Sequence, residues 1–168
     1  FHSFSNPPGL TGGGICNDLI SNIDFLPTLA SLTGAAQPKL KIDGLDFIPY
    51  LTGKDKEPPR KYLCFYFQRN SLEAVTDGRF KLIFPHAYQS YEMYEPGMDG
   101  APGRIGRRII DSLEMYDLRQ DPGERCNVIG MFPEKETELL RVADGIRVDL
   151  GDDLTGIEGT GRRKPGKK

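Results

Sequence analysis

Residues 72–84 read LEAVTDGRFKLIF, two apolar segments on either side of the dipeptide Asp77-Gly78. Asp-Gly between two such segments is a strong signal for a β-hairpin, because both residues accept the positive φ angles that tight hairpin turns require. The stretch therefore predicts two antiparallel strands, over residues 72–75 and 80–84, and with them an antiparallel sheet.

The sequence on both sides of the hairpin predicts further strands and one long connection. Residues 62–68 form a continuous aromatic and apolar run, which predicts a strand buried on both faces. Residues 113–118 predict another strand, and residues 121–124 (DPGE) predict a turn, because Pro fixes φ and Gly adds freedom. Residues 85–112 show no sustained periodicity, so we predict a long loop there, of the kind that is functional or disordered.

The last regular element predicted is a long amphipathic helix that begins at Pro133, a residue favoured in the first turn. Its apolar positions recur at spacings of four, three and four residues: Leu139, Ala143, Ile146 and Leu150. Gly151 is expected to end the helix. Gly145 in its interior costs about 1 kcal/mol relative to Ala, so tertiary packing must hold this helix.

A shorter helix is predicted near the N-terminus, with Asp24 as its cap and Gly34 as its end. One face of it is apolar: Phe25, Leu29 and Leu32, with Leu26 beside them. A charged, Pro-rich connector follows at residues 54–60. Because such connectors separate domains, we divide the chain into residues 1–60, 61–156 and a basic tail at 157–168.

Composition narrows the classes of partner. The 168 residues are 38% hydrophobic and 27% charged, with 20 Gly and 13 Pro, which is typical of a soluble globular chain rich in turns. The last eight residues hold five basic and no acidic residues, which leaves a net charge of −7 on the rest. Nucleic acid is therefore not an expected partner. A membrane is not expected either, because no run approaches the about 20 apolar residues of a span.

The residues alone predict a small α+β domain without a catalytic centre of its own. Cys16, Cys64 and Cys126 are too far apart for a metal motif, which leaves open one Cys16–Cys126 bridge in an oxidising compartment. A catalytic triad or zinc site would have to use His86, since the other histidine, His2, lies at the terminus. Three remaining patterns favour capping, solvation or a flexible loop over catalysis: Asp43 with Asp46, Asp152 with Asp153, and the Gly12–Gly14 run.

Five blocks, in this order and spacing, resemble the late part of sulfatase sequences: residues 22–34 (NIDFLPTLASLTG), 42–46 (IDGLD), 51–53 (LTG), 74–83 (AVTDGRFKLI) and 115–127 (MYDLRQDPGERCN). The resemblance covers about residues 7–156 and is to arylsulfatase-A-like members. It implies the tail of an alkaline-phosphatase-like α/β domain up to about residue 60. A small antiparallel sheet packed by the C-terminal helix would follow.

The resemblance also implies a chemistry. Sulfatases hydrolyse sulfate esters with a formylglycine, made from Cys or Ser in a Cys/Ser-x-Pro-x-Arg motif, and with a calcium ion held by Asp and Asn oxygens. None of the three cysteines stands in that motif, and the family's calcium ligands lie upstream of the matched part. We therefore expect calcium in the parent enzyme, no catalytic or metal residue in this chain, and no activity from the chain alone.

The expected partners are a sulfate ester, bound by the parent, and the N-terminal sulfatase domain. In the family the small domain helps to wall the active-site cleft, so the 85–112 loop is predicted to border the substrate pocket, with His86 and Tyr88 as substrate contacts. Family membership would place the parent in a periplasm, a lysosome or the medium. Two alternatives stay open: a non-catalytic interaction domain with this fold, and another hydrolase of the alkaline phosphatase superfamily.

Overall fold

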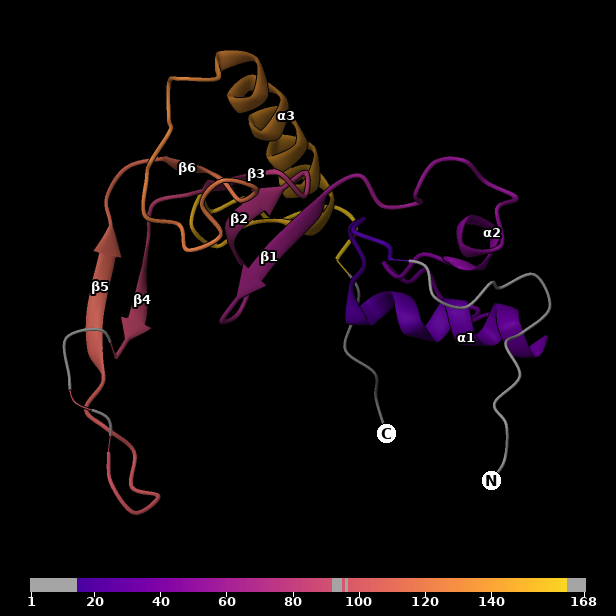
Figure 1. Ribbon diagram of the computed structural model, residues 1–168, viewed down its shortest axis with the longest axis horizontal. Helices are drawn as coiled ribbons and strands as arrows, with labels where there is room; N and C mark the ends of the chain where they lie inside the picture. Colours follow the sequence, from indigo (N-terminus) through magenta and orange to yellow (C-terminus); the bar gives the residue numbers. More distant parts are fainter. Residues whose placement is uncertain (1–14, 92–94, 96, 163–168) are drawn as a thin grey trace. The chain divides into compact units, whose positions relative to one another are not determined.

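The computed structural model describes residues 15–91, 95 and 97–162 (Figure 1). The Gly12–Gly14 run, His2 and the end of the basic tail lie outside the described residues. The chain divides into two compact units, Phe1–Leu63 and Cys64–Lys168. Their correspondence to the two sulfatase domains stays a prediction.

The first unit contains a short 3-10 helix, η1 (Asn22–Asp24), followed by α1 (Phe25–Thr33) and α2 (Ile48–Leu51). Gly34 ends α1 with φ 69°, as predicted. Asp24 occupies the N-cap position of α1, as predicted, but its side chain makes no hydrogen bond to the start of that helix. Its carboxylate is turned instead towards other segments of the unit.

The apolar face predicted for α1 is largely exposed. Its four residues are 40–58% exposed: Phe25, Leu26, Leu29 and Leu32. The buried residues of α1 are Pro27 and Ala30. An exposed apolar helix face of this kind is typical of a surface that packs against another element.

The second unit is built on a four-stranded sheet in the order β1-β2-β3-β6. Its strands are β1 (Leu63–Phe67), β2 (Ser71–Thr76), β3 (Phe80–Ile83) and β6 (Glu114–Asp117). β2 and β3 form the predicted hairpin, with Val75 opposite Leu82, and β6 pairs antiparallel with β3, with Met115 opposite Leu82. All three of these side chains are buried, and the α+β fold is confirmed.

Two details of the sheet differ from the prediction. β1 is not buried on both faces: it lies at the edge of the sheet, and Phe65 and Phe67 are 42% and 59% exposed. In the hairpin, Gly78 has φ 90° but Asp77 does not have a positive φ. The Asp77 carboxylate instead accepts the backbone N–H groups of Arg79 and Phe80, at 2.9 and 2.7 Å.

The long loop predicted over residues 85–112 is partly wrong. Within it, β4 (His86–Ser90) and β5 (Gly106–Ile110) pair antiparallel as a two-stranded ribbon beside the sheet (Figure 1). Their sequences, HAYQS and GRRII, do not alternate between apolar and polar residues. The period-2 signal that identifies a half-buried strand is therefore missing from both.

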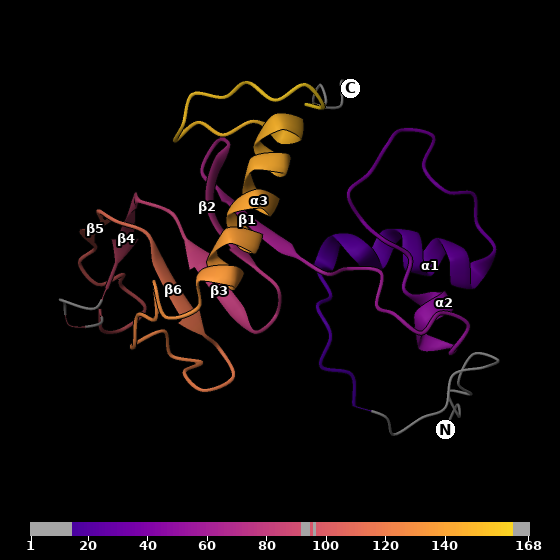
Figure 2. The same cartoon turned by 90° about the horizontal axis from the view of Figure 1, so that it is seen from above.

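The C-terminal helix, α3 (Pro133–Leu150), begins at Pro133 and is followed by Gly151, as predicted. It packs against β2 and β3 (Figure 2). Leu139 and Ala143 are fully buried, and the Phe80 and Phe132 rings lie 4.9 Å apart between their centroids. Burial of this apolar stripe fixes α3 on one face of the sheet and leaves the other face uncovered by it.

Gly145→Ala is expected to raise the free energy of unfolding by about 1 kcal/mol, because Gly is the weaker helix former. A Cβ at this position meets no atom within 4 Å. Urea denaturation measures the change. Gly151→Ala is the matched control of opposite sign, since Gly151 has φ 81° and its Cβ would lie 2.7 Å from the Ile157 carbonyl oxygen. A loss of stability in Gly145→Ala would contradict the helical interior described here.

Candidate functional site: a groove on the open face of the sheet

Strand pairing separates the side chains of β3 by face. Phe80 and Leu82, with Phe84 just beyond β3, are two residues apart and therefore share one face. That face is the one that α3 covers, because the Phe132 ring packs on Phe80 and the Arg147 guanidinium lies 4.3 Å from the centroid of the Phe84 ring. Lys81 and Ile83 therefore point to the opposite face. Directly paired residues share a face, so Tyr116, opposite Lys81, lies there too.

A groove of about 510 Å³ occupies this open face. Edge strand β1, the centre of the sheet and the β4–β5 ribbon all contribute to its lining, which includes Phe65, Phe67, Lys81, His86, Tyr88 and Tyr116. The structure thus brings both predicted site residues, His86 and Tyr88, to one groove. Their role as substrate contacts stays a prediction.

His86 joins the ribbon to the sheet. Its Nδ1 lies 2.7 Å from the Phe84 carbonyl oxygen, and its Nε2 lies 3.2 Å from the Glu73 carboxylate on β2. Both ring nitrogens therefore face oxygen acceptors. Only 8% of the side chain is exposed, so little of the imidazole is open to a ligand. These contacts fit a residue that fixes the start of β4 against β2.

Tyr88 lies further along the ribbon, half-buried, with its ring 5.9 Å from the His86 ring between centroids. The period of two along a strand places His86 and Tyr88 on the same face of β4. Fixing His86 therefore also sets where Tyr88 meets the groove.

The polar groups of the groove bind one another. Lys81 Nζ lies 2.7 Å from the Glu124 carboxylate and 5.4 Å from the centroid of the Phe65 ring. The Tyr116 hydroxyl donates to Glu114 at 2.8 Å. Burial, together with this hydrogen bond, raises the pKa of Tyr116. The groove is therefore an aromatic surface whose lining holds three carboxylates and one lysine, each bonded to a neighbouring side chain.

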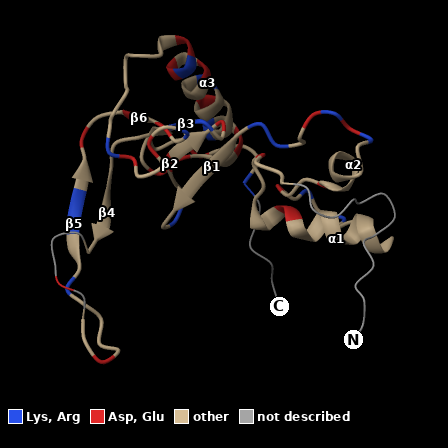
Figure 3. Ribbon diagram, viewed as in Figure 1, with Lys and Arg blue, Asp and Glu red and all other residues tan. Residues whose placement is uncertain are grey.

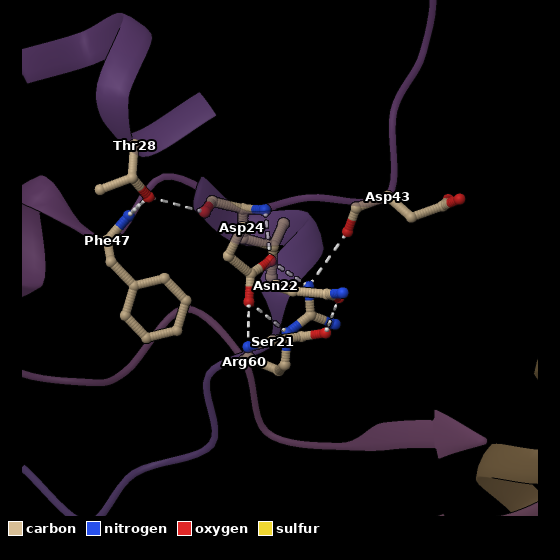
Figure 4. Close-up of polar contacts among 8 residues, drawn as sticks. Ser21, Asn22, Asp24, Thr28, Asp43, Phe47 and Arg60 are labelled. Carbon is tan, nitrogen blue, oxygen red and sulfur yellow. Dashed lines mark hydrogen bonds and ion pairs between the residues drawn. The ribbon is translucent and has the colours of Figure 1, made fainter. Parts of the chain in front are cut away.

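A second polar cluster lies in the first unit and is centred on Asp24 (Figure 4). The fully buried Asp24 carboxylate accepts the backbone N–H groups of Ser21 and Leu45, both at 2.8 Å. Arg60 Nε donates to the same carboxylate at 3.0 Å, and Arg60 Nη2 donates to it and to the Asp43 carbonyl oxygen. One carboxylate thus connects three chain segments, which is a structural rather than a catalytic arrangement.

The chain is similar to known proteins over most of its length, although no family model matches it. Human arylsulfatase A is 31% identical over 153 residues, a match that covers 80% of this chain and 27% of that protein. N-acetylgalactosamine-6-sulfatase of the dog is 32% identical over 129 residues, 71% of this chain and 24% of that protein. The chain belongs to the sulfatase family. It spans about a quarter of the length of these relatives.

The solved structures include sulfatases of the same fold. A 2-O GAG sulfatase superposes on this sulfatase chain with a TM-score of 0.59 and 20% identity, covering 94% of this chain and 34% of that one. At that identity the likeness shows the fold alone. It supports the small antiparallel sheet and packed C-terminal helix as a sulfatase architecture.

The turn carboxylates of this sulfatase segment bind backbone rather than forming an acid–base pair. Asp152 is fully buried. One of its oxygens accepts the N–H groups of Leu72 and Leu154, at 3.1 and 2.9 Å, and the other accepts Arg147 Nε at 2.9 Å. Asp46 accepts the Ile48 N–H at 2.9 Å. These contacts agree with the prediction that the turn aspartates cap backbone N–H groups instead of forming a catalytic pair of carboxylates.

The described part of the sulfatase chain offers no group of three or more His, Cys, Asp or Glu side chains that could hold a metal ion. Cys16 and Cys126 are exposed free thiols, so the bridge left open by the sequence is not formed. None of the helices within the described ranges is long and apolar enough to cross a membrane.

Proposed function

We propose that this chain is the C-terminal portion of a sulfatase that hydrolyses sulfate esters. The observation that carries the proposal is 31% identity to human arylsulfatase A over 80% of the chain, within 27% of that protein's length. On this proposal the formylglycine nucleophile and the calcium ion belong to the part of the enzyme outside this chain, and that part is the segment's principal partner.

The exposed apolar face of α1 is the proposed contact with the rest of the enzyme. The isolated 168-residue chain is then expected to bind a hydrophobic dye, to self-associate in sedimentation experiments and to leave 4-nitrophenyl sulfate intact. Leu29→Lys places a charge in the middle of that face and should reduce dye binding. If the isolated chain hydrolysed 4-nitrophenyl sulfate and a point change within it abolished the activity, the catalytic residues would not lie outside this chain. If the chain were a monomer that binds no hydrophobic dye, the α1 face would not be the contact with the rest of the enzyme.

The groove is the proposed contribution of this segment to the substrate cleft. Aromatic walls with a few placed polar groups are typical of small-molecule sites, and the lining combines Phe65, Tyr88 and Tyr116 with a few charged side chains. Tyr88 would contact the part of the substrate beyond the sulfate. His86 would act mainly by holding the ribbon, through Glu73 and the Phe84 carbonyl group.

Tyr88→Ala in the complete enzyme is expected to lower kcat/KM on the native sulfate ester by about tenfold and to leave kcat/KM on 4-nitrophenyl sulfate unchanged, since a lost pocket contact changes discrimination between substrates.

His86→Ala is expected to lower the free energy of unfolding by about 1–3 kcal/mol, because it leaves the acceptors of the imidazole unpaired. Tyr91→Ala is the control, an exposed tyrosine just beyond β4.

If Tyr88→Ala and Tyr91→Ala had the same ratio of kcat/KM on the native ester to kcat/KM on 4-nitrophenyl sulfate, the β4–β5 ribbon would not be part of the substrate site. A parent that hydrolyses phosphodiesters but not sulfate esters would instead assign the chain to another branch of the superfamily.

A further inference from the structure

The β4–β5 ribbon has a second face, opposite the one that bears His86 and Tyr88. The period of two along a strand, and the pairing of Gln89 with Arg107 and of Ala87 with Ile109, place these four residues on it. A cleft of about 450 Å³ is lined by Ala87, Gln89 and Arg107 from this face, by Tyr88, which also lines the groove, and by Gln68 and Leu154 from neighbouring segments. We call it the Arg107 cleft.

The Arg107 cleft differs from the groove in its charge. Among its described lining residues Arg107 is the one that carries a charge, and no carboxylate lines the cleft with it. In the groove, by contrast, Lys81 is paired with Glu124, and two further carboxylates, Glu73 and Glu114, line the same surface. Figure 3 shows the basic stretch of β5 that includes this position. Unlike the groove, the cleft therefore has a positive charge that its own lining does not neutralise.

The side chains that line the cleft narrow the chemical class of ligand that it can bind. A guanidinium group donates from five N–H groups, accepts none and stays charged, so it pairs best with the two oxygens of a carboxylate or a sulfate. The amides of Gln68 and Gln89 both donate and accept, which suits hydroxyl groups. Ile105, Leu154 and Tyr88 add apolar surface. The cleft volume lies within the range of small-molecule sites.

We propose that the Arg107 cleft is a second binding site, which takes an anionic sugar unit and pairs its carboxylate or sulfate oxygens with the guanidinium of Arg107. Oxyanion and hydroxyl groups on one small molecule match the cation and the two amides together. The site shares Tyr88 with the proposed substrate groove but is otherwise lined by different residues, and the proposal holds whether or not that groove contacts a sulfate ester.

The test is a titration of the ¹⁵N-labelled 168-residue chain followed by NMR. The probes are glucuronic acid, N-acetylglucosamine 6-sulfate, uncharged N-acetylglucosamine and inorganic sulfate. We expect the two anionic sugars to shift the amide signals of Gln68, Ala87 and Gln89. Arg107→Gln should raise the Kd of both anionic sugars about tenfold, because it removes a charge-assisted hydrogen bond. Arg141→Gln, on an exposed position of α3, is the matched control and should leave the Kd unchanged.

Three results would overturn the proposal. Equal shifts from N-acetylglucosamine and its 6-sulfate would show that the cleft does not recognise charge. Equal weakening by Arg107→Gln and Arg141→Gln would show non-specific attraction to the surface. Inorganic sulfate that binds as tightly as the sulfated sugar would exclude a sugar site. Unchanged hydrolysis of 4-nitrophenyl sulfate by the complete Arg107→Gln enzyme would separate this site from the catalytic role of the parent.

Discussion

Asp24→Asn is expected to lower the stability of the Phe1–Leu63 unit by about 3–5 kcal/mol, the range for breaking a buried ion pair. The Asp24 side chain is fully buried, and the Arg60 side chain is 11% exposed. The amide keeps the shape of the carboxylate but carries no charge, so the guanidinium remains buried without a counter-ion. The N–H groups of Ser21 and Leu45 lose their charged acceptor as well.

Amide hydrogen exchange at Ser21 and Leu45 measures this effect within the unit. Exchange should accelerate strongly in Asp24→Asn and stay unchanged in Asp55→Asn, a matched control at an exposed aspartate of the same unit. Equal protection in both variants would show that the Asp24 cluster does not hold the three segments together.

The same cluster predicts how this unit responds to acid. Burial alone would raise the pKa of Asp24, but hydrogen bonds from Arg60, Leu45 and Ser21 outweigh burial and hold the pKa below its ordinary value of 3.8. A carboxyl with a lowered folded-state pKa contributes stability above its unfolded pKa and loses it as the pH falls through the folded pKa. Protection at Leu45 should therefore persist at pH 4 and decline progressively as the pH falls below 3.8, a dependence absent from Asp24→Asn.

Asp152→Ala is expected to lower the stability of the second unit by about 3–5 kcal/mol. Arg147 would lose its buried counter-ion, and the N–H groups of Leu72 and Leu154 would lose their acceptor. The matched control is the next residue, Asp153→Ala. Its carboxylate is 43% exposed and 3.6 Å from Arg162, so its loss should change stability by about 0–1 kcal/mol.

Urea denaturation of the two variants side by side decides between a buried anchor and a solvated turn. If both changes lower the free energy of unfolding by the same small amount, the Asp152 carboxylate is not the anchor that these contacts describe. A large loss confined to Asp152→Ala would confirm it.

The elements predicted correctly are those that local sequence determines. Gly78 positions the β2–β3 hairpin and Gly151 ends α3, because each adopts a positive φ at the required place. What failed depends on distant residues. The Asp24 carboxylate binds Leu45 and Arg60, 21 and 36 residues away, rather than its own helix. The exposure of Phe67 follows from the position of β1 at the sheet edge, which its own sequence does not encode.

The candidate site was predictable only in part, for the same reason. A histidine directly after a predicted strand drew attention to His86, and Tyr88 lies two residues beyond it. Lys81, Tyr116 and Glu124 were missed, because they meet in the groove only once β3 and β6 are paired. Alternation along residues 80–83 (FKLI) already places the Lys81 side chain on the other face of the strand from Leu82. That alternation was the available signal.

The bond between Leu72 and Asp152 has a consequence for synthesis of the chain, because its two partners are 80 residues apart. At about 5–20 residues per second, a ribosome takes roughly 4–16 seconds to add that length. During this interval the amide at the start of β2 has no carboxylate to bind, so the start of β2 stays unanchored. Folding of the second unit thus waits for the last part of the chain, and any product ending before residue 152 would present an unanchored hairpin to the quality control of the cell.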